Sequence, residues 1–317
     1  MKKQKTVMRH VRLAGMGKAL AGGELCFAGE KRYRLRAGET FSDLMYQASC
    51  RALAAAGMEI EDMDCIVCAT ATPVQAIPCN AALLHERLAK GLDIPAFDVN
   101  STCTSFVTAL DVLSCMTEMG RYRRVLIVSG DMASAALNPA QRESYELFSD
   151  GAAACVLTAA AEEDCGILYS RQKTWSEGAH DTEIRGGGSA LPVFSMEEGN
   201  RPDYYFDMKG SRILKLCARK LPDFLNLCLR EAGVRREDID LVVPHQASRA
   251  LDVMMPRLGF PKGTYVNRVS CYGNLISASI PYALCETAEE GRLQRGHLVL
   301  LIGTAAGLTC NFMLLRY

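Results

Sequence analysis

The stretch Gly57-Met-Glu-Ile-Glu-Asp-Met-Asp-Cys-Ile-Val67 has a close copy in the second half of the chain, Gly233-Val-Arg-Arg-Glu-Asp-Ile-Asp-Leu-Val-Val243. Each copy follows a stretch with helical periodicity, residues 41–56 in the first case and 212–232 in the second. Each therefore predicts a helix, a glycine that ends it, an acidic turn and a buried strand. Repetition of such a unit indicates an internal duplication.

The correspondence continues along both copies. After Cys103 we expect a helix to about Met119 and then a strand over 125–129. After Asn274 we expect a helix to about Glu290 and then a strand over 298–302. Strands that alternate with helices predict an α/β fold. We therefore predict two pseudo-symmetric halves, residues 1–165 and 166–317. The polar, glycine-rich stretch 172–200 is expected to form loop and cover.

Composition excludes several classes of protein. The 317 residues carry 36 basic and 36 acidic side chains, so the formal net charge is zero and gives no electrostatic case for nucleic acid or an acidic membrane. No apolar stretch approaches the roughly 18 to 20 residues of a membrane span. The basic start, residues 1–5, is not followed by the apolar segment of a signal peptide. We expect a cytoplasmic protein.

Fourteen cysteines are scattered along the chain, many of them in apolar runs. In a chain of this length they are interpreted as reduced, small hydrophobic residues and not as a disulfide framework. Cys65 and Cys68 have the spacing of a metal or redox motif. They lie in a strand-like run without a second cysteine pair or a nearby histidine cluster, so we expect no metal site there.

Cys103 lies in Pro95-Ala-Phe-Asp-Val-Asn-Ser-Thr-Cys103, where a short apolar run ends in a polar turn. A helical pattern starts directly behind it. A helix N-terminus favours a thiolate, so this position predicts a nucleophilic cysteine with a depressed pKa and an accessible sulfur. A buried structural cysteine is the alternative.

His245 and Asn274 are the candidate partners. His245 follows the strand that ends at Pro244, and ligands of α/β sheets bind at the carboxyl ends of strands. Asn274 precedes the second-half counterpart of the helix behind Cys103. If the halves pack with pseudo-symmetry, the mouths of both helices face one site. A surface histidine and an ordinary Gly-Asn turn are the alternatives.

A third signal is the small-residue stretch Ile302-Gly-Thr-Ala-Ala-Gly-Leu-Thr309 at the end of a buried strand. Small residues let backbone approach a ligand closely, so this turn could supply an N–H group to an oxyanion. A simple hairpin turn is the alternative.

These motifs resemble those of the thiolase superfamily, specifically of condensing enzymes of the ketoacyl-acyl-carrier-protein synthase III type. The resemblance rests on Phe97-Asp-Val-Asn-Ser-Thr-Cys103, Val243-Pro-His-Gln-Ala247 and Tyr272-Gly-Asn274. Phe148-Ser-Asp-Gly-Ala-Ala153 and Gly303-Thr-Ala-Ala-Gly-Leu-Thr309 add to it. Five motifs in the family's order are more specific than any one. The resemblance implies a thiolase-like fold, a layered α/β/α/β/α sandwich.

The resemblance also implies an activity. Cys103 would take an acyl group from a thioester and then condense it with a malonyl group on acyl carrier protein, with loss of carbon dioxide. His245 and Asn274 would stabilise the enolate, and the N–H groups of Cys103 and Ala306 would form the oxyanion hole. No metal or organic cofactor is implied, and the enzyme would be a homodimer. The alternative is an acyltransferase on the same scaffold that moves an acyl group to a hydroxyl or an amine.

Further positions follow by motif matching alone. Ile77 falls where the family inserts a side chain into the partner's acyl pocket, and Arg142 falls on a coenzyme A contact. The other matched positions are the substrate-binding residues Phe148, Met208, Ser211 and Ser248 and a basic rim for acyl carrier protein made of Arg212, Lys215 and Arg249. For the rim residues, solvated helix surface is the alternative.

The sequence departs from the family in two places. Residues 22–40 lack the tryptophan and the Arg-Thr-Gly-Ile motif that help hold coenzyme A, so the primer could arrive on coenzyme A or on acyl carrier protein. Ala305 and Ala306 stand where the family usually has glycines, and a shifted oxyanion turn is expected from them. Both departures favour a specialised fatty-acid or polyketide-type pathway.

Overall fold

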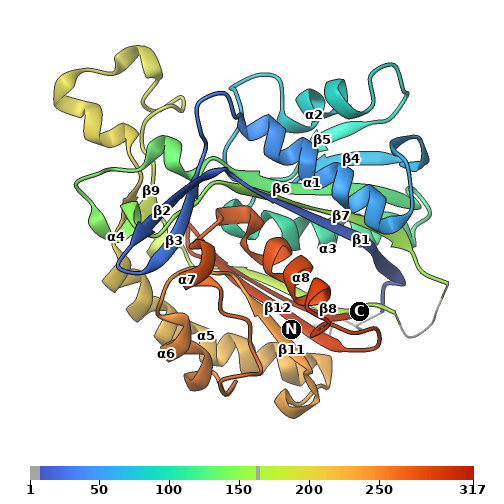
Figure 1. The fold of residues 1–317 in the computed structure, drawn as a ribbon. Coiled ribbons are helices and arrows are strands. Elements are labelled where there is room, and N and C mark those ends of the chain that lie inside the picture. The colour runs from blue at the N-terminus through green and yellow to red at the C-terminus, as the bar shows by residue number, and fades with distance from the viewer. Residues whose placement is uncertain (1–7, 162–164) are drawn as a thin grey trace.

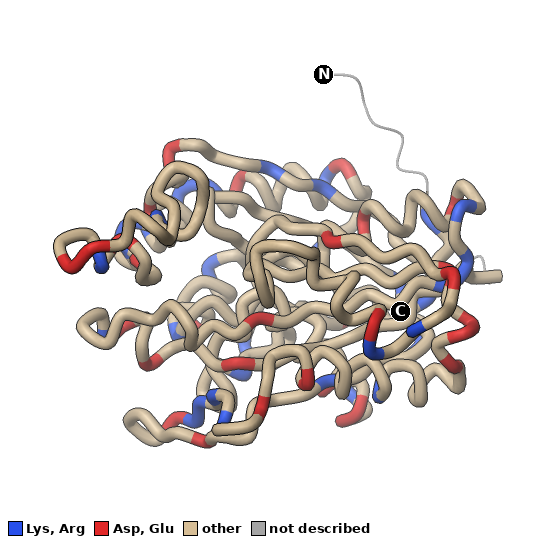
Figure 2. The backbone as a smooth tube through the Cα atoms, turned by 90° about the horizontal axis from the view of Figure 1, so that it is seen from above, with Lys and Arg blue, Asp and Glu red and all other residues tan. Residues whose placement is uncertain are grey.

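The structure, a computed structural model, describes residues 8–161 and 165–317. The basic start of the chain, which entered the expectation of no signal peptide, lies outside the described residues. No helix within the described ranges has the length and apolar character needed to cross a membrane. Basic and acidic residues, which are equal in number, are both scattered over the backbone seen from above (Figure 2).

Two sheets form the framework. The first has the order β1-β7-β6-β4-β5, with β4, β5 and β6 parallel and β1 and β7 antiparallel to their neighbours. Its strands are β1 (Val11–Leu20), β4 (Cys65–Cys68), β5 (Ala96–Asp98), β6 (Arg124–Asp131) and β7 (Gly151–Ala159). The second has the order β11-β12-β13-β8. Its strands are β8 (Gly166–Thr174), β11 (Leu241–Pro244), β12 (Leu298–Ala305) and β13 (Thr309–Arg316).

Helices cover both sheets and fill the space between them (Figure 1). α1 (Phe41–Ala56) and α2 (Asn80–Leu88) pack on the outer face of the first sheet. α3 (Ser105–Glu118) and α8 (Ser279–Glu289) lie between the sheets. α5 (Gly210–Ala232) and α6 (Leu251–Arg257) cover the outer face of the second sheet. This confirms the predicted α/β/α/β/α sandwich.

The repeated unit forms the same structure in both copies. α1 and α5 end at Gly57 and Gly233, whose φ angles of 64° and 69° fit only a residue without a β-carbon comfortably. A short 3₁₀ turn then leads into β4 in the first copy and β11 in the second. Helix and strand periodicity therefore predicted these elements correctly, because each buries one continuous apolar face.

The remaining elements are short and lie near the ends of the sheets. They are the hairpin of β2 (Gly23–Phe27) and β3 (Glu30–Arg34), the strand pair β9 (Thr182–Glu183) and β10 (Asp207–Met208), and the helices α4 (Arg142–Tyr145) and α7 (Val269–Tyr272). The expected loop over 172–200 is wrong in two places, because residues 172–174 continue β8 and pair with β13, and β9 pairs with β10. No disulfide joins any cysteines of the described residues.

Candidate active site

A cavity of about 1170 Å³ opens where the ends of the two sheets meet. Cys103, His245 and Asn274 all line it, although they come from three distant segments of the chain. Ala305 and Ala306, at the end of β12, line it as well. The two helix mouths therefore face one site, as pseudo-symmetry predicted.

The loop before α3 fixes Cys103. Thr102 has a φ of 53°, a conformation that few residues with a β-carbon adopt. The Oδ1 atom of Asn100 holds it there by accepting a hydrogen bond from the Thr102 N–H at 2.8 Å. The N–H of Ser101, which lies between Asn100 and Thr102, donates to Ser105 Oγ at 2.9 Å. These bonds place Cys103 in a 3₁₀ turn directly before α3.

The loop before α8 repeats this arrangement bond for bond. Ile276 has a φ of 51°, its N–H donates to Asn274 Oδ1 at 2.8 Å, and the Leu275 N–H donates to Ser279 Oγ at 3.0 Å. Asn274 is thus the counterpart of Asn100. The residue in the place of Cys103 is Ser277.

Burial dominates the electrostatics of Cys103. Loss of solvent raises the pKa of its thiol to about 12, the negative charge of Asp131 adds to this, and the backbone N–H groups of Ala306 and Cys103 act in the opposite sense. The predicted depressed pKa is therefore wrong: the helix mouth lies in a desolvated cavity, and the cost of an unsolvated thiolate exceeds the help of the dipole. These N–H groups of Ala306 and Cys103 are the two that the family resemblance assigned to an oxyanion hole.

The turn that carries Ala306 is also the hairpin turn between β12 and β13. A shifted turn was expected on the ground that alanines disfavour a positive φ. Neither Ala305 nor Ala306 has one, because the positive φ in this turn, 116°, is at Gly307. At Gly303, a β-carbon would lie 3.1 Å from the β-carbon of His245 and 3.0 Å from Thr104, so glycine lets β12 approach both catalytic segments.

His245 is 4% exposed and follows β11 directly. Its backbone is fixed on both sides, with its N–H donating to Ile302 O and its carbonyl accepting from the Ala247 N–H, both at 2.8 Å. Burial lowers the pKa of the imidazole to about 4, so the ring is neutral near pH 7. Its Nδ1 atom meets no hydrogen-bond partner among the described residues. A neutral ring of this kind can donate one hydrogen bond to a substrate oxygen.

Asn274 is oriented so that its NH₂ group can serve a ligand. Its Oδ1 atom is occupied by the Ile276 N–H and by Ser279 Oγ at 3.2 Å, whereas Nδ2 makes only a long bond of 3.5 Å to Ala247 O. The backbone of Asn274 pairs with the segment around Phe148, through Asn274 N–H to Leu147 O at 2.9 Å and Ser149 N–H to Asn274 O at 3.0 Å. The Phe148 motif therefore holds Asn274 in place.

The buried carboxylate of Asp131 joins the segment that follows β4 to the loop before α8. Its Oδ1 accepts from the backbone N–H and the hydroxyl of Thr72 at 2.8 and 2.7 Å. Its Oδ2 accepts from the N–H and the hydroxyl of Ser277 at 3.0 and 2.6 Å. Burial nevertheless raises the pKa of this carboxyl to about 6, with these hydrogen bonds opposing the rise.

Comparison with known proteins agrees with this geometry. Residues 97–175 match the family model described as 3-Oxoacyl-[acyl-carrier-protein (ACP)] synthase III, and residues 229–317 match the model of its C-terminal part. A beta-ketoacyl-[acyl-carrier-protein] synthase III of Clostridium perfringens is 36% identical over 290 residues, which cover 90% of this chain and 87% of that protein.

The chain belongs to this family.

Solved structures agree with the family assignment. The 3-oxoacyl-[acyl-carrier-protein] synthase III of Aquifex aeolicus superposes with a TM-score of 0.86 at 28% identity and covers 97% of this chain and 100% of its own. The priming beta-ketosynthase of the R1128 polyketide pathway gives a TM-score of 0.86 at 25% identity, with 99% and 98% covered.

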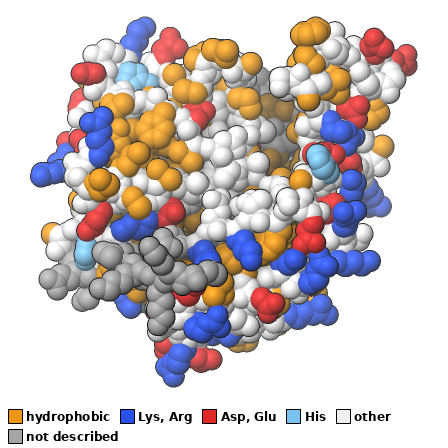
Figure 3. All heavy atoms as spheres, turned by 180° about the vertical axis from the view of Figure 1, so that it is seen from behind, with side chains coloured by type: hydrophobic (Ala, Val, Ile, Leu, Met, Phe, Trp, Pro, Cys, Tyr) orange, Lys and Arg blue, Asp and Glu red, His pale blue; other side chains and the backbone are white. Residues whose placement is uncertain are grey.

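Most substrate positions taken from the synthase III family lie on the cavity wall. Those that line it are Arg142, Phe148, Met208, Ser211, Ser248 and Arg249. Ile77 does not, and its side chain is 84% exposed. Arg212 and Lys215 lie on the exposed side of α5, next to the cavity wall but outside it. Basic and acidic side chains are mixed on the face seen from behind (Figure 3).

Two of the three rim residues have partners within the chain. Arg212 is paired with Asp181 at 2.8 Å, and Arg249 is paired with Glu30 at 2.8 Å. An acidic ligand would have to displace these carboxylates. Arg142, also exposed, is paired with Glu146 at 2.6 Å.

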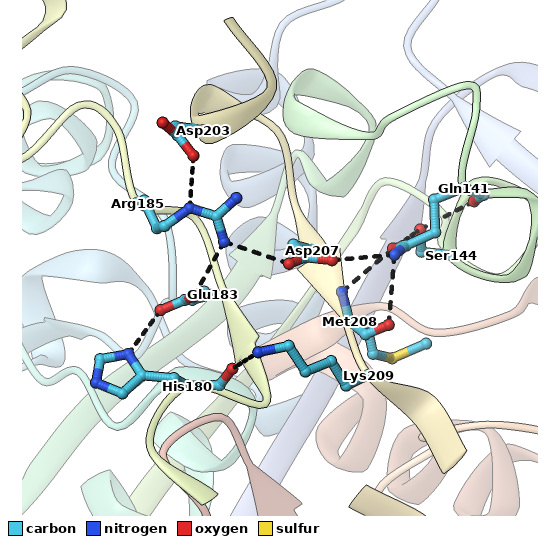
Figure 4. A network of polar contacts seen from close by, with 9 residues as sticks. All are labelled: Gln141, Ser144, His180, Glu183, Arg185, Asp203, Asp207, Met208 and Lys209. Atoms are coloured by element: carbon cyan, nitrogen blue, oxygen red, sulfur yellow. Dashed lines mark hydrogen bonds and ion pairs between the residues drawn. The ribbon is translucent and has the colours of Figure 1, made fainter. Parts of the chain in front are cut away.

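A polar network holds the wall that contains Met208 (Figure 4). The side-chain amide of Gln141 accepts from the Met208 N–H at 3.2 Å and donates to the Met208 carbonyl at 3.3 Å. Arg185 bridges Glu183, Asp203 and Asp207 beside it, at distances of 3.0, 2.6 and 3.3 Å. Strands β9 and β10 are therefore tied to each other and to the segment before α4.

Sequence reasoning missed Arg32, Asp131 and Asn100. Arg32 is 1% exposed, lines the cavity, and donates to the Glu146 carbonyl at 2.8 Å and to Glu30 at 2.6 Å. Arg32 lies within residues 22–40, which lack the family's coenzyme A motif. The polar sequence of this hairpin predicts exposed side chains, so the burial of Arg32 could not be predicted from it. Asn100, by contrast, could have been found by aligning the two repeats, because it precedes Cys103 as Asn274 precedes Ser277.

Proposed function

We propose that this protein catalyses the decarboxylative condensation of an acyl thioester with malonyl-acyl carrier protein to give a β-ketoacyl product. The observation that carries the proposal is the convergence on one cavity of a thiol, a neutral imidazole and an amide NH₂ group whose internal hydrogen bond is long, at 3.5 Å. The names of the relatives, which are beta-ketoacyl-acyl-carrier-protein synthases III, support the same reaction.

In the first half-reaction the sulfur of Cys103 attacks the carbonyl carbon of the primer thioester. A carbon–sulfur bond to Cys103 forms and the bond to the carrier sulfur breaks, while the proton of the Cys103 thiol passes to the leaving carrier thiolate. The negative oxygen formed on the way is stabilised by the N–H groups of Ala306 and Cys103. Each such donor typically contributes about 3 to 4 kcal/mol to the transition state.

In the second half-reaction the malonyl carbon–carbon bond breaks and its electron pair becomes an enolate as carbon dioxide leaves. His245 and Asn274 donate hydrogen bonds to the enolate oxygen. The imidazole of His245 is neutral because its pKa is low, and Nδ2 of Asn274 has only one long internal hydrogen bond. The carbanion then forms a carbon–carbon bond to the acyl group and expels the sulfur of Cys103, which regains a proton from solvent. The side chains supply all of these groups, so the proposal needs no metal or organic cofactor.

The substrate carriers and the assembly are part of the proposal. Arg212, Lys215 and Arg249 form a basic rim suited to the acidic surface of acyl carrier protein, and the primer arrives on coenzyme A or on a carrier protein. Strand β5 is the edge of the first sheet, and the exposed Ile77 lies on the loop before α2. We propose a homodimer in which Ile77 enters the partner's cavity, in the cytoplasm, in a specialised fatty-acid or polyketide-type pathway.

The alternative, transfer of the acyl group to a hydroxyl or an amine, rests on the altered oxyanion turn and the altered entrance. Neither Ala305 nor Ala306 has a positive φ, so the turn gives no support to this alternative, and the departure in residues 22–40 is its remaining basis.

Intact-mass spectra with a panel of acyl thioesters test the first half-reaction, and release of carbon dioxide from malonyl-acyl carrier protein tests the second. We expect an acyl adduct on Cys103 and a β-ketoacyl product. An adduct without carbon dioxide release would identify the alternative, and no adduct with any primer would overturn the proposal.

A further inference from the structure

A cluster of hydrogen-bonding side chains holds the start of α3 against β13. Its members are Ser101, Thr104 and Thr108 around the start of α3 and Asn311 on β13. Thr104 is fully buried and Asn311 is 3% exposed. None of these four described residues lines the cavity, so the cluster lies outside the substrate site. We call it the α3–β13 cluster.

The hydrogen bonds of the cluster run in one direction. Nδ2 of Asn311 donates to Thr108 Oγ1 at 2.9 Å and, over a longer distance of 3.4 Å, to the Thr104 carbonyl. Nε2 of Gln172, on the neighbouring strand β8, also donates to Thr108 Oγ1, at 3.4 Å. A hydroxyl has two lone pairs and one proton, so the Thr108 hydroxyl is left to donate to Ser101 Oγ, 2.6 Å away. The chain of bonds therefore leads from β13 into the loop that carries the nucleophile.

The cluster joins the two segments whose N–H groups are proposed to form the oxyanion hole. The start of α3 carries the N–H of Cys103. Asn311 pairs with Gly303 in the hairpin of β12 and β13, and the turn of this hairpin carries Ala306. The distance between the two N–H groups therefore depends on how α3 is held against β13.

The second half of the chain has apolar side chains at the corresponding places. The alignment that matches Asn100 with Asn274 gives, as counterparts of the three hydroxyl residues, Leu275, Ala278 and Tyr282. On the strands, β4 and β6 pair in the same register as β11 and β12, which makes Ala153 the counterpart of Asn311. These four counterparts belong to one apolar cluster.

The fold is therefore stable at this place without hydrogen bonds. When both partners of a hydrogen bond are replaced by apolar groups of the same shape, the effect on stability can be close to zero. Hydrogen bonds differ from apolar contacts because they fix both a distance and a direction. The first half has the polar cluster beside Cys103, which has to be aligned with the turn of Ala306, whereas the second half has the apolar cluster beside Ser277.

We propose that Asn311 and Thr108 are positioning residues that set the oxyanion hole by holding the N–H group of Cys103 in place relative to that of Ala306. This inference rests on the proposed function for the use of the oxyanion hole. Neither side chain lines the cavity, so each acts on the reaction through the backbone of α3 and of β13.

Two reagents separate the oxyanion hole from the reactivity of the thiol. p-Nitrophenyl acetate transfers its acetyl group through an intermediate with a negative carbonyl oxygen: a carbon–sulfur bond forms, p-nitrophenolate leaves and the thiol proton passes to solvent. Iodoacetamide forms its carbon–sulfur bond with loss of iodide and a proton, and no such oxygen develops. Both rates scale with the fraction of thiolate, so their ratio at one pH reports the oxyanion hole. Mass spectrometry of the peptide that contains Cys103 measures both rates, with Cys103→Ala as the blank.

Thr108→Val removes the hydroxyl and keeps the shape of the side chain. It should lower the ratio of acetylation to alkylation about tenfold, because complete loss of one oxyanion donor costs about 10²- to 10³-fold and this change only displaces a donor. Asn311→Leu should lower the ratio by a similar factor. Thr108→Ser keeps the hydroxyl and should restore a ratio close to that of the wild type. An unchanged ratio in both Thr108→Val and Asn311→Leu would overturn the proposal.

Thr287→Val is the matched control on the other central helix. Thr287 is fully buried, and its hydroxyl bonds to the carbonyls of Ala283 and Leu284 in its own helix, both at 2.9 Å. The variant loses a buried hydroxyl of the same kind and should keep the wild-type ratio. An equal fall in Thr287→Val and Thr108→Val would show that general loosening lowers acetylation and would refute the positioning role. If Thr108→Val does not fold, Ser101→Ala removes the same hydrogen bond from its other end and should give the same fall.

These measurements separate the two proposals, because acetylation by p-nitrophenyl acetate needs no malonyl group. A wild type that releases no carbon dioxide, together with a fall of the ratio in Thr108→Val, would refute the proposed condensation and keep the positioning role. Release of carbon dioxide with an unchanged ratio in the variants would do the reverse. A wild-type Cys103 that iodoacetamide alkylates but that the ester does not acetylate would overturn the positioning role, since no oxyanion hole would then act.

Discussion

Asp131 accepts two hydrogen bonds from Ser277, one from the hydroxyl at 2.6 Å and one from the backbone N–H at 3.0 Å. Ser277 occupies in the second half the position that Cys103 occupies in the first. The carboxylate thus holds the loop that carries Ser277, while its negative charge raises the pKa of the Cys103 thiol, the proposed nucleophile. Asp131 therefore stabilises the loop before α8 and at the same time disfavours the thiolate form of Cys103.

Asp131→Asn removes the charge and should lower the pKa of Cys103. Because the pKa of Asp131 is about 6, the carboxyl is ionised at pH 8 in the wild type. The pH at which alkylation of Cys103 by iodoacetamide is half-maximal should fall by about one unit. Ser277→Ala is the matched control, since it loosens the loop and keeps the charge. An equal acceleration in both variants would show that loop movement, not charge, governs the thiol.

Gly273→Ala should disturb Asn274 without touching a substrate. Gly273 has a φ of 73°, and a β-carbon there would lie 2.2 Å from the Leu147 carbonyl, within the pairing that holds Asn274. Condensation should fall about 10- to 100-fold while loading of Cys103 persists, with a loss of roughly 1 to 3 kcal/mol in stability. Gly291→Ala is the control, because Gly291 has the same φ and nothing within 4 Å. It should cost only about 1 kcal/mol and leave condensation intact, and similar losses of condensation in both would refute the steric explanation.

Asn274→Ala and Asn100→Ala should separate the two half-reactions. Loss of the Asn274 donor should slow release of carbon dioxide about 10²- to 10³-fold with acyl loading preserved. Asn100 positions Thr102 and so Cys103, so Asn100→Ala should slow acyl loading, which mass spectrometry follows directly. The pair is matched in residue type and in loop geometry. Identical kinetic defects would contradict the distinct roles.

The sequence predicted the fold, and its three candidate residues Cys103, His245 and Asn274 do line one cavity. Amphipathic periodicity and the repeat depend on local pattern, which is why these features could be predicted. It could not predict what depends on contacts between distant segments. In the sequence, Asp131 is only the last residue of a strand, and its contacts with Thr72 and Ser277 exist only in the folded protein. Arg32 lies in a polar hairpin, and its burial is likewise seen only in the folded protein. The pKa of Cys103 was misjudged for the same reason, since desolvation is a property of the assembled cavity.

His245 should make stability depend on pH. Its pKa is about 4 in the folded protein and about 6.5 in an unfolded chain, so its contribution is complete above pH 6.5 and is lost as pH falls through 4. Between these values the wild type should lose about 3 kcal/mol more than His245→Gln, at 1.36 kcal/mol per pKa unit. The raised pKa of Asp131 makes the protein more stable as pH falls through about 6, which opposes the effect of His245. Both the wild type and His245→Gln contain Asp131, so the difference in stability between these two proteins isolates the effect of His245. Urea unfolding at pH 6.5, 5 and 4 provides it, and parallel curves for both would refute a neutral, buried imidazole.

Ile77→Glu tests the proposed homodimer. Ile77 is a large apolar side chain that is 84% exposed, a state that burial in a partner would explain. A charge at this position should weaken the dimer, because an unpaired carboxylate would be buried in the interface. Light scattering at a series of concentrations should show dimers for the wild type and a shift toward monomers for the variant. Val193→Glu, at an exposed residue on another loop, is the control and should leave the mass unchanged. A wild type that is monomeric at every concentration would show that Ile77 has another role.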